Sequence, residues 1–439
     1  MEQALAHTKF HLGYFTKFGP PAWRAESDRT HGDDWWTGQH FAKLGRRLEK
    51  SFFDFMFFED SVNVSRVYQN SMDADLKFAI YTPKHDPLQL LPYLAGQTER
   101  IGLIGTASTS FYPPYLLARA LSTADSLSSG RVGWNMVTSS ERDAARNFGM
   151  DALPSPIERY DRADEFVELA KALWDSWEEG SLVIDQETNT YIDPSKVHAI
   201  DYVGKYHRSR GPLNTLRSPQ GRPVLAQAGA SDRGRDFAAK HADAVFALTG
   251  SGIEEMKALR SDLRARAKSH GRNPDDLKIF WATPAYITQG GGPVDRSFSD
   301  SEFVRIVAWW STFFDLDLSN YDLDNPMPEG VTAMGHTSMM NQLQTWGRDM
   351  GVTLRQGLTM MAQGSDEIGI AGPAEKVAAN LVAAMDEVGG DGIMILSNDV
   401  GNERFVSSIV DELVPELQRL GVVRTSYSGA TLRENLRAF

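Results

Sequence analysis

The chain of 439 residues is 41% hydrophobic, carries a formal net charge of −13 and contains no cysteine. The acidic balance argues against a nucleic-acid partner, which would need a basic surface, and the missing cysteines exclude disulfides, thiolate metal sites and a cysteine nucleophile. No apolar run is long enough to span a membrane, and the first residues lack the apolar segment of a signal peptide, so a cytoplasmic protein is expected.

Strands alternate with helices from the start of the chain. The predicted elements are strands over 10–15, 53–58 and 101–108 and helices over 34–50, 88–98 and 112–127. The second strand ends at Glu59 and Asp60, which are either site carboxylates or solvated loop charges. The third strand ends in small, hydroxylated residues, which let a flat ligand lie close to the backbone. This alternation is typical of right-handed βαβ units and a parallel sheet.

The chain is organised around residues 128–148, SSGRVGWNMVTSSERDAARNF. The strand predicted over 131–138 is apolar on both faces, as expected of a parallel strand that is covered on both sides. Asn135 interrupts it, and a buried amide is costly unless it finds hydrogen-bond partners. Ser139 and Ser140 offer an N-cap to the next helix. Asn135 is therefore either a site residue at a strand end, where α/β folds place their chemistry, or a structural group that holds the loop.

The second half of the chain continues the pattern. The predicted elements are a helix over 158–177, strands over 224–228, 244–248, 277–282 and 391–397, and a closing helix over 402–420. Eight strands, mostly followed by helices, predict a TIM (β/α)8 barrel as a single domain over 1–439. The loop-rich stretch at about 180–222 is interpreted as an insertion packed on that barrel. Ser231, after the fifth strand, is a potential helix N-cap, which indicates either an anion site or plain capping.

A second insertion, at about 290–373, is too long for a simple connection and is interpreted as a lid. Its aromatic residues Trp309, Trp310 and Phe313 are predicted to line a substrate pocket, although they could equally pack the lid itself. Arg305 is the one cation of this stretch, whereas a polycarboxylate would need several converging Arg or Lys residues. An apolar or aromatic substrate, with sulfur- and nitrogen-containing compounds included, is therefore favoured. No metal site is expected, because no cluster of His and carboxylates has ligand spacing.

Three motifs, GRVGWNMVTS…NFG, ERYDRADEF and QAGASDRGRDFAAKHADAVF, resemble the bacterial-luciferase-like superfamily. More narrowly, the chain resembles the two-component flavin monooxygenases that oxidise nitrilotriacetate, dibenzothiophene sulfone and long-chain alkanes, from about Phe10 to the C-terminal VPEL. The resemblance implies a TIM barrel with insertions, reduced FMN supplied by a separate NAD(P)H:flavin reductase, O2 as co-substrate, and a homodimer or homotetramer.

The resemblance also implies a set of FMN contacts. Asp60, Thr106 and Asn135 resemble contacts to the flavin ring, and Tyr160 and Ser231, with Ala230 beside it, resemble contacts at the phosphate end. The chain departs from its relatives at Pro156 and Ser140, where many or some of them carry histidine, and at Trp309 and Trp310, near a lid histidine of others. No catalytic residue is therefore assigned. His11 and His336 are candidates for proton transfer by residue type, and a structural role is the simpler reading of each.

Three other functions remain open at this point. The first is an oxidoreductase on the same fold that uses deazaflavin F420 and needs no O2. The second is a flavin-binding protein without turnover. The third is a glycosidase-like barrel that uses Glu59 and Asp60. This last alternative is disfavoured because adjacent residues at a strand end point to opposite faces, which suits two-carboxylate chemistry poorly.

Overall fold

A closed barrel of parallel strands forms the centre of the protein, in the spatial order β1-β14-β11-β10-β9-β4-β3-β2. The computed structural model describes residues 7–21, 23, 34–229, 231–249, 252–288, 298–335, 337–363, 368–396 and 402–439. The barrel strands are β1 (Phe10–Lys17), β2 (Phe55–Glu59), β3 (Gly102–Ser108), β4 (Val132–Val137), β9 (Val224–Gln227), β10 (Ala244–Leu248), β11 (Lys278–Pro284) and β14 (Asp391–Leu396). The predicted TIM barrel is confirmed, and each predicted strand overlaps one of these eight.

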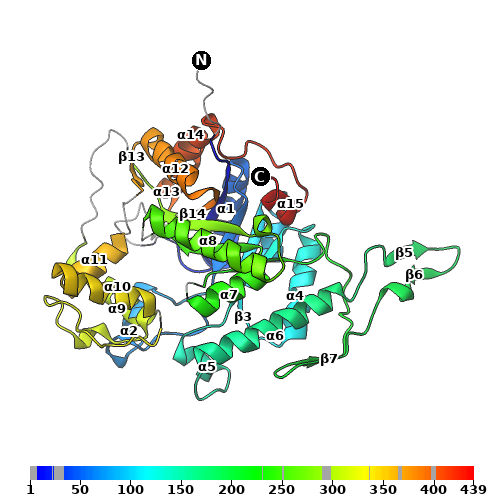
Figure 1. Cartoon of the computed structure of the whole chain (residues 1–439), viewed down its shortest axis with the longest axis horizontal. Helices are drawn as coiled ribbons and strands as arrows, with labels where there is room; N and C mark the ends of the chain where they lie inside the picture. The colour runs from blue at the N-terminus through cyan, green and yellow to red at the C-terminus, as the bar shows by residue number, and fades with distance from the viewer. Residues whose placement is uncertain are drawn as a thin grey trace.

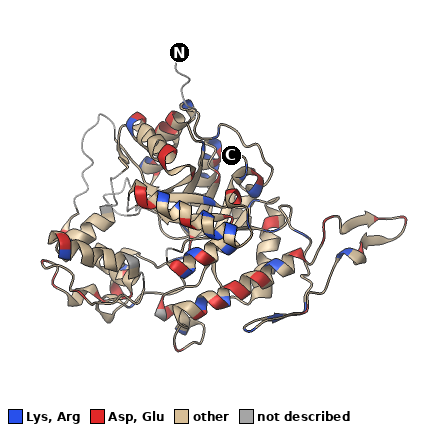
Figure 2. Ribbon diagram, viewed as in Figure 1, with Lys and Arg blue, Asp and Glu red and all other residues tan. Residues whose placement is uncertain are grey.

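Helices surround the barrel, as Figure 1 shows for α4, α6, α7, α8 and α12. Charged residues lie along these outer helices, whereas the strands inside contain few (Figure 2). The helices around the barrel are α1 (Gln39–Lys50), α3 (Pro87–Ala95), α4 (Pro114–Leu127), α5 (Arg142–Asn147), α6 (Pro156–Asp175), α7 (Asp232–His241), α8 (Ile253–Ser269), α12 (Ala374–Val388), α13 (Glu403–Ser407) and α14 (Val414–Arg419), whereas α2 (Asp73–Phe78) lies beside the lid insertion. A π-helical turn, Ser408–Leu413, joins the last two.

Phenylalanines fill one layer of the barrel interior. The rings of Phe55 and Phe280 meet edge to face with their centroids 4.8 Å apart, and those of Phe57 and Phe246 do so at 4.6 Å. Gly13 on β1 makes room for them, because a Cβ at this position would lie 2.4 Å from the Phe55 ring. This packed aromatic layer blocks the lumen, so a ligand can enter the barrel only from one of its two ends.

The C-terminal tail closes the end of the barrel at which the strands begin. The short helix α15 (Leu432–Leu436) inserts Leu432 and Leu436 into the inner cluster beside the phenylalanines. Arg433 pairs with Asp243 at 2.8 Å and also donates to the carbonyl oxygens just before β9. Apolar burial and satisfied charges thus fix the tail in place, and the opposite end remains for chemistry.

The insertion at 180–222 differs from its prediction. It contains the hairpins β5 (Leu182–Asp185) with β6 (Thr190–Ile192) and β7 (Tyr202–Val203) with β8 (Arg208–Ser209). Figure 1 shows the β5–β6 hairpin at the end of a slender extension that points away from the barrel, and all four residues of β5 are exposed. The expectation that this insertion packs on the barrel is wrong for the β5–β6 hairpin, because turn residues at its ends indicated only a loop-rich segment and gave no direction.

The described part of the lid insertion is largely helical. Its elements are α9 (Asp300–Phe314), α10 (Thr337–Met350) and α11 (Leu354–Gln363), and the short strands β12 (Tyr286–Ile287) and β13 (Ala371–Gly372) pair at its base. The three helices share a small hydrophobic core of their own. The helix α9 packs on α2, which lies in the segment after β2. Ser65, earlier in that segment, and Thr312, on α9, also share a 2.7 Å hydrogen bond between their hydroxyl groups. The lid therefore sits at the end of the barrel where the strands finish.

Candidate active site

A buried pair of polar side chains lies inside the barrel on two neighbouring strands. Thr106 on β3 and Asn135 on β4 are directly opposite each other in the sheet register. Asn135 Nδ2 donates to Thr106 Oγ1 at 2.9 Å, and that hydroxyl donates to the carbonyl oxygen of Phe58 at 2.7 Å. Asn135 is 3% exposed, and its Oδ1 atom has no partner among the described residues. A buried carbonyl oxygen without a hydrogen bond is costly, so it indicates a missing donor.

Charged side chains gather where β1 and β2 end. Lys84 donates to both carboxylate oxygens of Glu59 and to Ser61 Oγ, each at 2.9 Å, which uses all three of its N–H groups. Lys17 is opposite Glu59 in the register and makes one hydrogen bond of 3.3 Å, to the carbonyl oxygen of Ile80. Burial, reinforced by Lys84, lowers the pKa of Lys17 to about 8. Among the described residues, Lys17 thus has two donors without a partner; the sequence did not indicate it, since its residue type gave no signal.

Asp60 follows this cluster directly. Its burial raises the pKa of the carboxyl to about 7; Glu59 adds to the rise and Lys84 opposes it. Asp60 therefore changes charge near neutral pH. Glu59, in contrast, is held in its ion pair with Lys84. The two adjacent carboxylates do not form an acid–base pair of the glycosidase type, because one is already engaged in a structural contact.

The N-terminus of α7 forms a second polar cluster. Ser231 is the N-cap of this helix, and its Oγ accepts the backbone N–H of Gly234 at 3.1 Å. The hydroxyl of Tyr160 on α6 lies close to the side chains of Ser231 and of Gln227 at the end of β9, and burial raises the pKa of Tyr160. The structure thus brings Tyr160 and Ser231 together from distant parts of the sequence. Ala230 lies outside the described residues.

Arginines flank this cluster, with different partners. Arg233 stacks over the Tyr160 ring with 5.7 Å from its guanidinium carbon to the ring centroid, and it pairs with Asp161 and Asp164. Its charge is therefore already balanced. Arg159 donates from Nη1 to the carbonyl oxygen of Pro154 at 3.0 Å, and its buried Nε has no partner among the residues that the structure describes. Arg159 is a candidate anion contact that only its position beside Tyr160 could have indicated.

The aromatic side chains of α9 divide into two groups. Trp309 stacks on Phe313 with centroids 5.0 Å apart and lies nearly parallel to Tyr81 at 6.3 Å. Trp310 is 4% exposed and packs in the lid's own core, stacked on Phe314. The structure thus puts Trp310 among lid residues, whereas Trp309 and Phe313 reach the segment after β2.

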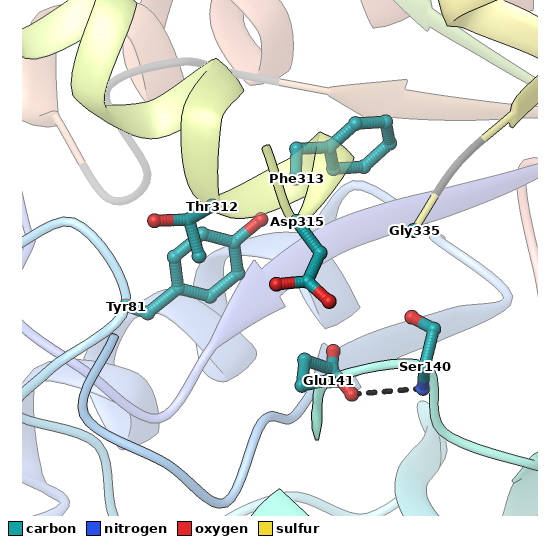
Figure 3. A pocket seen from close by; sticks show the side chains of 7 residues that line it. All are labelled: Tyr81, Ser140, Glu141, Thr312, Phe313, Asp315 and Gly335. Carbon is teal, nitrogen blue, oxygen red and sulfur yellow. Dashed lines mark hydrogen bonds between the residues drawn. The ribbon is translucent and has the colours of Figure 1, made fainter. Parts of the chain in front are cut away.

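A small hollow lies between the lid and the barrel. Figure 3 shows the carboxylates of Glu141 and Asp315 pointing toward the same space, with the Tyr81 ring beside them. The lining residues are Tyr81, Ser140, Glu141, Thr312, Phe313, Asp315 and Gly335. Of the three predicted substrate contacts, only Phe313 is in this lining. Neither carboxylate was predicted: Glu141 lies within residues 128–148 but at the start of the helix expected there, and Asp315 lies outside the three motifs.

Of the two histidine candidates, His11 does not join this site. His11 lies at the start of β1, at the closed end of the barrel, where its Nδ1 bonds Asp54 at 2.9 Å and its ring stacks on Phe439. His336 lies outside the described residues. Within the described ranges, no group of His and carboxylate side chains is arranged to hold a metal ion, and no helix is long and apolar enough to cross a membrane.

Comparison with known proteins gives a consistent picture. The family model for luciferase-like monooxygenase matches residues 10–391. Dibenzothiophene-sulfone monooxygenase of Rhodococcus erythropolis is 35% identical over 94% of this chain and 92% of its own, and nitrilotriacetate monooxygenase component A of Aminobacter aminovorans is 33% identical over 91% and 89%. The crystal structure of a long-chain alkane monooxygenase superposes with a TM-score of 0.81 at 32% identity, covering 98% of this chain and 95% of that one.

A riboflavin lyase, crystallised with modified FMN and riboflavin, also superposes with a TM-score of 0.81, at 29% identity over 98% of this chain and 96% of its own. The fold, the family match and the full-length relatives agree. The chain belongs to the luciferase-like monooxygenase family, and it is an oxidoreductase of the two-component, flavin-dependent monooxygenase type.

Proposed function

We propose that this protein binds reduced FMN at the open end of the barrel and uses it with O2 to oxygenate a small organic substrate. The observation that carries the proposal is the unpartnered Oδ1 of Asn135, buried beside Thr106 inside the barrel. A flavin ring carries N–H groups that would satisfy this acceptor. Reduced FMN supplies the oxygen chemistry when bound, and the protein contributes orientation, electrostatics and exclusion of water.

The ring end of the cofactor is assigned to Thr106, Asn135 and Asp60. Thr106 uses its hydroxyl proton on Phe58, so it holds Asn135 in one orientation and leaves the amide oxygen available. Asp60 lies at the end of β2, the neighbour of β3, and is largely buried before any ligand arrives. These groups come from consecutive barrel strands, which fixes their positions more firmly than loops would.

The phosphate end is assigned to Tyr160, Ser231 and Ala230. A helix N-terminus with a cap hydroxyl favours an anion, since its free N–H groups and the helix dipole both point toward it. Arg233 is engaged by two carboxylates, so the cation that we assign to the phosphate is Arg159. Arg159 would thus replace the histidine that many relatives carry at the position of Pro156.

The substrate is proposed to be apolar or aromatic, with nitrogen- or sulfur-containing compounds favoured over polycarboxylates. Tyr81, Trp309 and Phe313 present nearly parallel rings, which suit a flat apolar ligand. Glu141 and Asp315 in the hollow would repel an anionic substrate. Trp309, Trp310 and Phe313 remain the proposed lid contacts, with Trp310 acting from behind through its edge-to-face packing on the other two.

The partner implied by this reaction is a separate NAD(P)H:flavin reductase. One of the relatives is named as component A of its system, which supports a division of labour between two proteins. The purified chain with FMN and NADH alone should therefore consume O2 slowly, and the addition of a flavin reductase should start substrate-dependent consumption.

Four outcomes of this assay and its F420 counterpart test the proposal. Rapid NADH oxidation by the chain alone would contradict the two-component proposal. Oxidation of a substrate by F420 without O2 would favour the F420 alternative. The monooxygenase relatives do not favour this alternative. Tight flavin binding with no turnover of any tested aromatic thioether, sulfone, amine or nitrilotriacetate would favour a flavin carrier. Turnover of nitrilotriacetate but not of the aromatic compounds would overturn the substrate class alone.

A further inference from the structure

Lys17 lies in the same layer of the barrel as the two polar residues assigned to the flavin ring. It points into the barrel, because Phe15, two residues earlier on β1, packs against the inner phenylalanines and side chains alternate along a strand. The register sets Lys17 opposite Glu59 on β2 and puts Glu59 level with Thr106 on β3. Thr106 is in turn opposite Asn135 on β4. Two strand spacings, about 10 Å, therefore separate Lys17 from Thr106, and a flavin of three fused rings bridges such a distance.

The position of Lys17 around the barrel suits the ring rather than the phosphate. The proposed phosphate site, at the start of α7, follows β9. In the barrel order, β9 lies four strands from β1 in either direction, so Lys17 projects from the opposite wall. With the phosphate at α7, a flavin that extends across the open end brings its ring toward Lys17. A contact here therefore depends on the state of the ring, which changes on reduction, and not on the phosphate, which does not change.

The charge of Lys17 has no carboxylate of its own among the described residues. Four charged side chains face it: Lys84, Glu59, Asp75 and Arg305. Glu59 is paired with Lys84, and Asp75 on α2 accepts two backbone N–H groups. Arg305 on α9 of the lid adds repulsion, and the one hydrogen bond of Lys17 goes to a backbone carbonyl oxygen at 3.3 Å. A desolvated cation of this kind costs free energy until an anion offsets the cost.

Reduction gives the flavin ring the negative charge that Lys17 lacks as a partner. The oxidised ring is neutral, whereas two electrons and one proton convert it into an anion. We infer that Lys17 donates a hydrogen bond to the reduced ring and makes the site select reduced over oxidised FMN. The inference rests on the proposed function, because it needs FMN at the open end. A charge-assisted hydrogen bond is about twice as strong as a neutral one, and a nearby charge is one of the means by which proteins tune a flavin.

One ratio of affinities isolates this contact, because reduced and oxidised FMN share the phosphate and the ribityl chain. Lys17→Met removes the charge and keeps a side chain of similar length. We expect it to weaken reduced FMN by about tenfold or more and oxidised FMN by less than about twofold. The midpoint potential of the bound flavin should fall accordingly, by about 30 mV for each factor of ten. Anaerobic binding titrations and a potentiometric titration measure both values without substrate or turnover.

Lys171→Met is the matched control. Burial, reinforced by Arg222, lowers the pKa of Lys171 on α6 to about 8 as well, and its Nζ lies 3.0 Å from His241 Nδ1. Lys171 belongs to neither proposed end of the cofactor site, so its loss should change neither affinity. Lys17→Arg is the second variant, since an arginine stays charged at every pH tested. It should keep most of the preference for reduced FMN at pH 7.

The pH dependence separates the charge of Lys17 from its shape. Burial lowers the pKa of Lys17 to about 8, so at pH 9 this side chain is mostly neutral in the free protein. The advantage of the wild type over Lys17→Met for reduced FMN is present below this pKa and should fall by up to about tenfold between pH 7 and pH 9. Lys17→Arg should keep its preference over this range. If Lys17→Met does not fold, the comparison of the wild type with Lys17→Arg decides the same question.

Two results would overturn the inference and leave FMN binding at the open end intact. One is an unchanged ratio of reduced to oxidised affinity in Lys17→Met. The other is equal weakening of both forms, which would place Lys17 on a part of FMN that reduction does not alter. A wild type that binds neither form would instead contradict the proposed function, and the inference with it.

Discussion

The two ends of the barrel hold buried polar groups in opposite ways. At the closed end, Asp54 is engaged by His11 at 2.9 Å, by Arg424 at 2.6 Å and by the backbone N–H of Leu12 at 2.9 Å. At the open end, Asn135 Oδ1 has no described partner. A carboxylate with matched donors stabilises the fold, whereas an acceptor left without a donor costs stability unless a ligand supplies one.

The pKa values reflect the same contrast. Burial alone would raise the pKa of Asp54, but His11 and Arg424 outweigh it and hold the pKa below its usual value. Burial of Asp60 is not outweighed, and its pKa rises to about 7. The first carboxyl is therefore fixed in one charge state, and the second titrates near neutral pH, at the place where we propose that the flavin ring binds. Perturbed groups of the second kind are typical of functional sites.

The largest expected effect is loss of stability at the closed end. Asp54→Ala leaves Arg424 buried without its carboxylate, which should cost about 3–5 kcal/mol in the free energy of unfolding. Because the folded pKa of Asp54 is lowered, its stabilisation is present above its unfolded pKa of about 3.9 and is lost as pH falls through the folded pKa. Urea unfolding at pH 7 measures the loss in the free energy of unfolding, and the same experiment at pH 3 measures how much of it depends on the charge of Asp54.

The control for this change is Asp349→Ala, which breaks an exposed ion pair with Arg348. It should leave the unfolding midpoint unchanged, since solvent screens such pairs. If Asp54→Ala proved as stable as this control, the closed end would not be the structural end of the barrel. FMN affinity of folded Asp54→Ala should match the wild type.

A smaller effect is expected at the open end, on binding rather than on folding. Asn135→Ala should weaken FMN and riboflavin equally, by about 1–3 kcal/mol or roughly 5- to 150-fold, because both share the ring. Ser110→Ala, which removes a rim hydroxyl bonded to the carbonyl oxygen of Thr138, is the matched control. Titration of both flavins by fluorescence checks the prediction. Unchanged affinity of Asn135→Ala would make Asn135 a purely structural group.

The smallest expected effect is a pH dependence. A flat ring over Asp60 removes further water from this carboxyl and raises its pKa above about 7, so binding takes up a proton. Flavin affinity should therefore fall as the pH rises from 6.5 to 8, by about tenfold at most for a one-unit shift. The ratio of wild-type to Asp60→Asn affinity isolates this effect, because the ligand's own titrations cancel. A ratio that stays constant over this range would separate Asp60 from the ring.

The same contrast explains what the sequence could predict. Strand and helix positions follow from apolar runs and their punctuation, which are local, and all eight barrel strands were found. Asn135, Tyr160 and Ser231 lie in the three motifs and Thr106 lies on the third predicted strand, so resemblance indicated all four. Lys17, Arg159, Glu141 and Asp315 were not predicted, although Arg159 lies within ERYDRADEF and Glu141 within residues 128–148, because their surroundings are created by segments far apart in the chain. Trp310 shows a further limit of the sequence: composition does not distinguish an aromatic residue in the core of a lid from one on the face that meets the barrel.

One affinity ratio tests whether the open end of the barrel binds FMN with its phosphate at the start of α7. Ser231→Ala should weaken FMN by about 1–3 kcal/mol and riboflavin by much less, since the cap hydroxyl serves the phosphate. Ser155→Ala, which removes the equivalent N-cap of α6, is the control and should change neither affinity. The account predicts a fall in the ratio of FMN to riboflavin affinity in Ser231→Ala alone. Equal weakening of both flavins, or none, would contradict it.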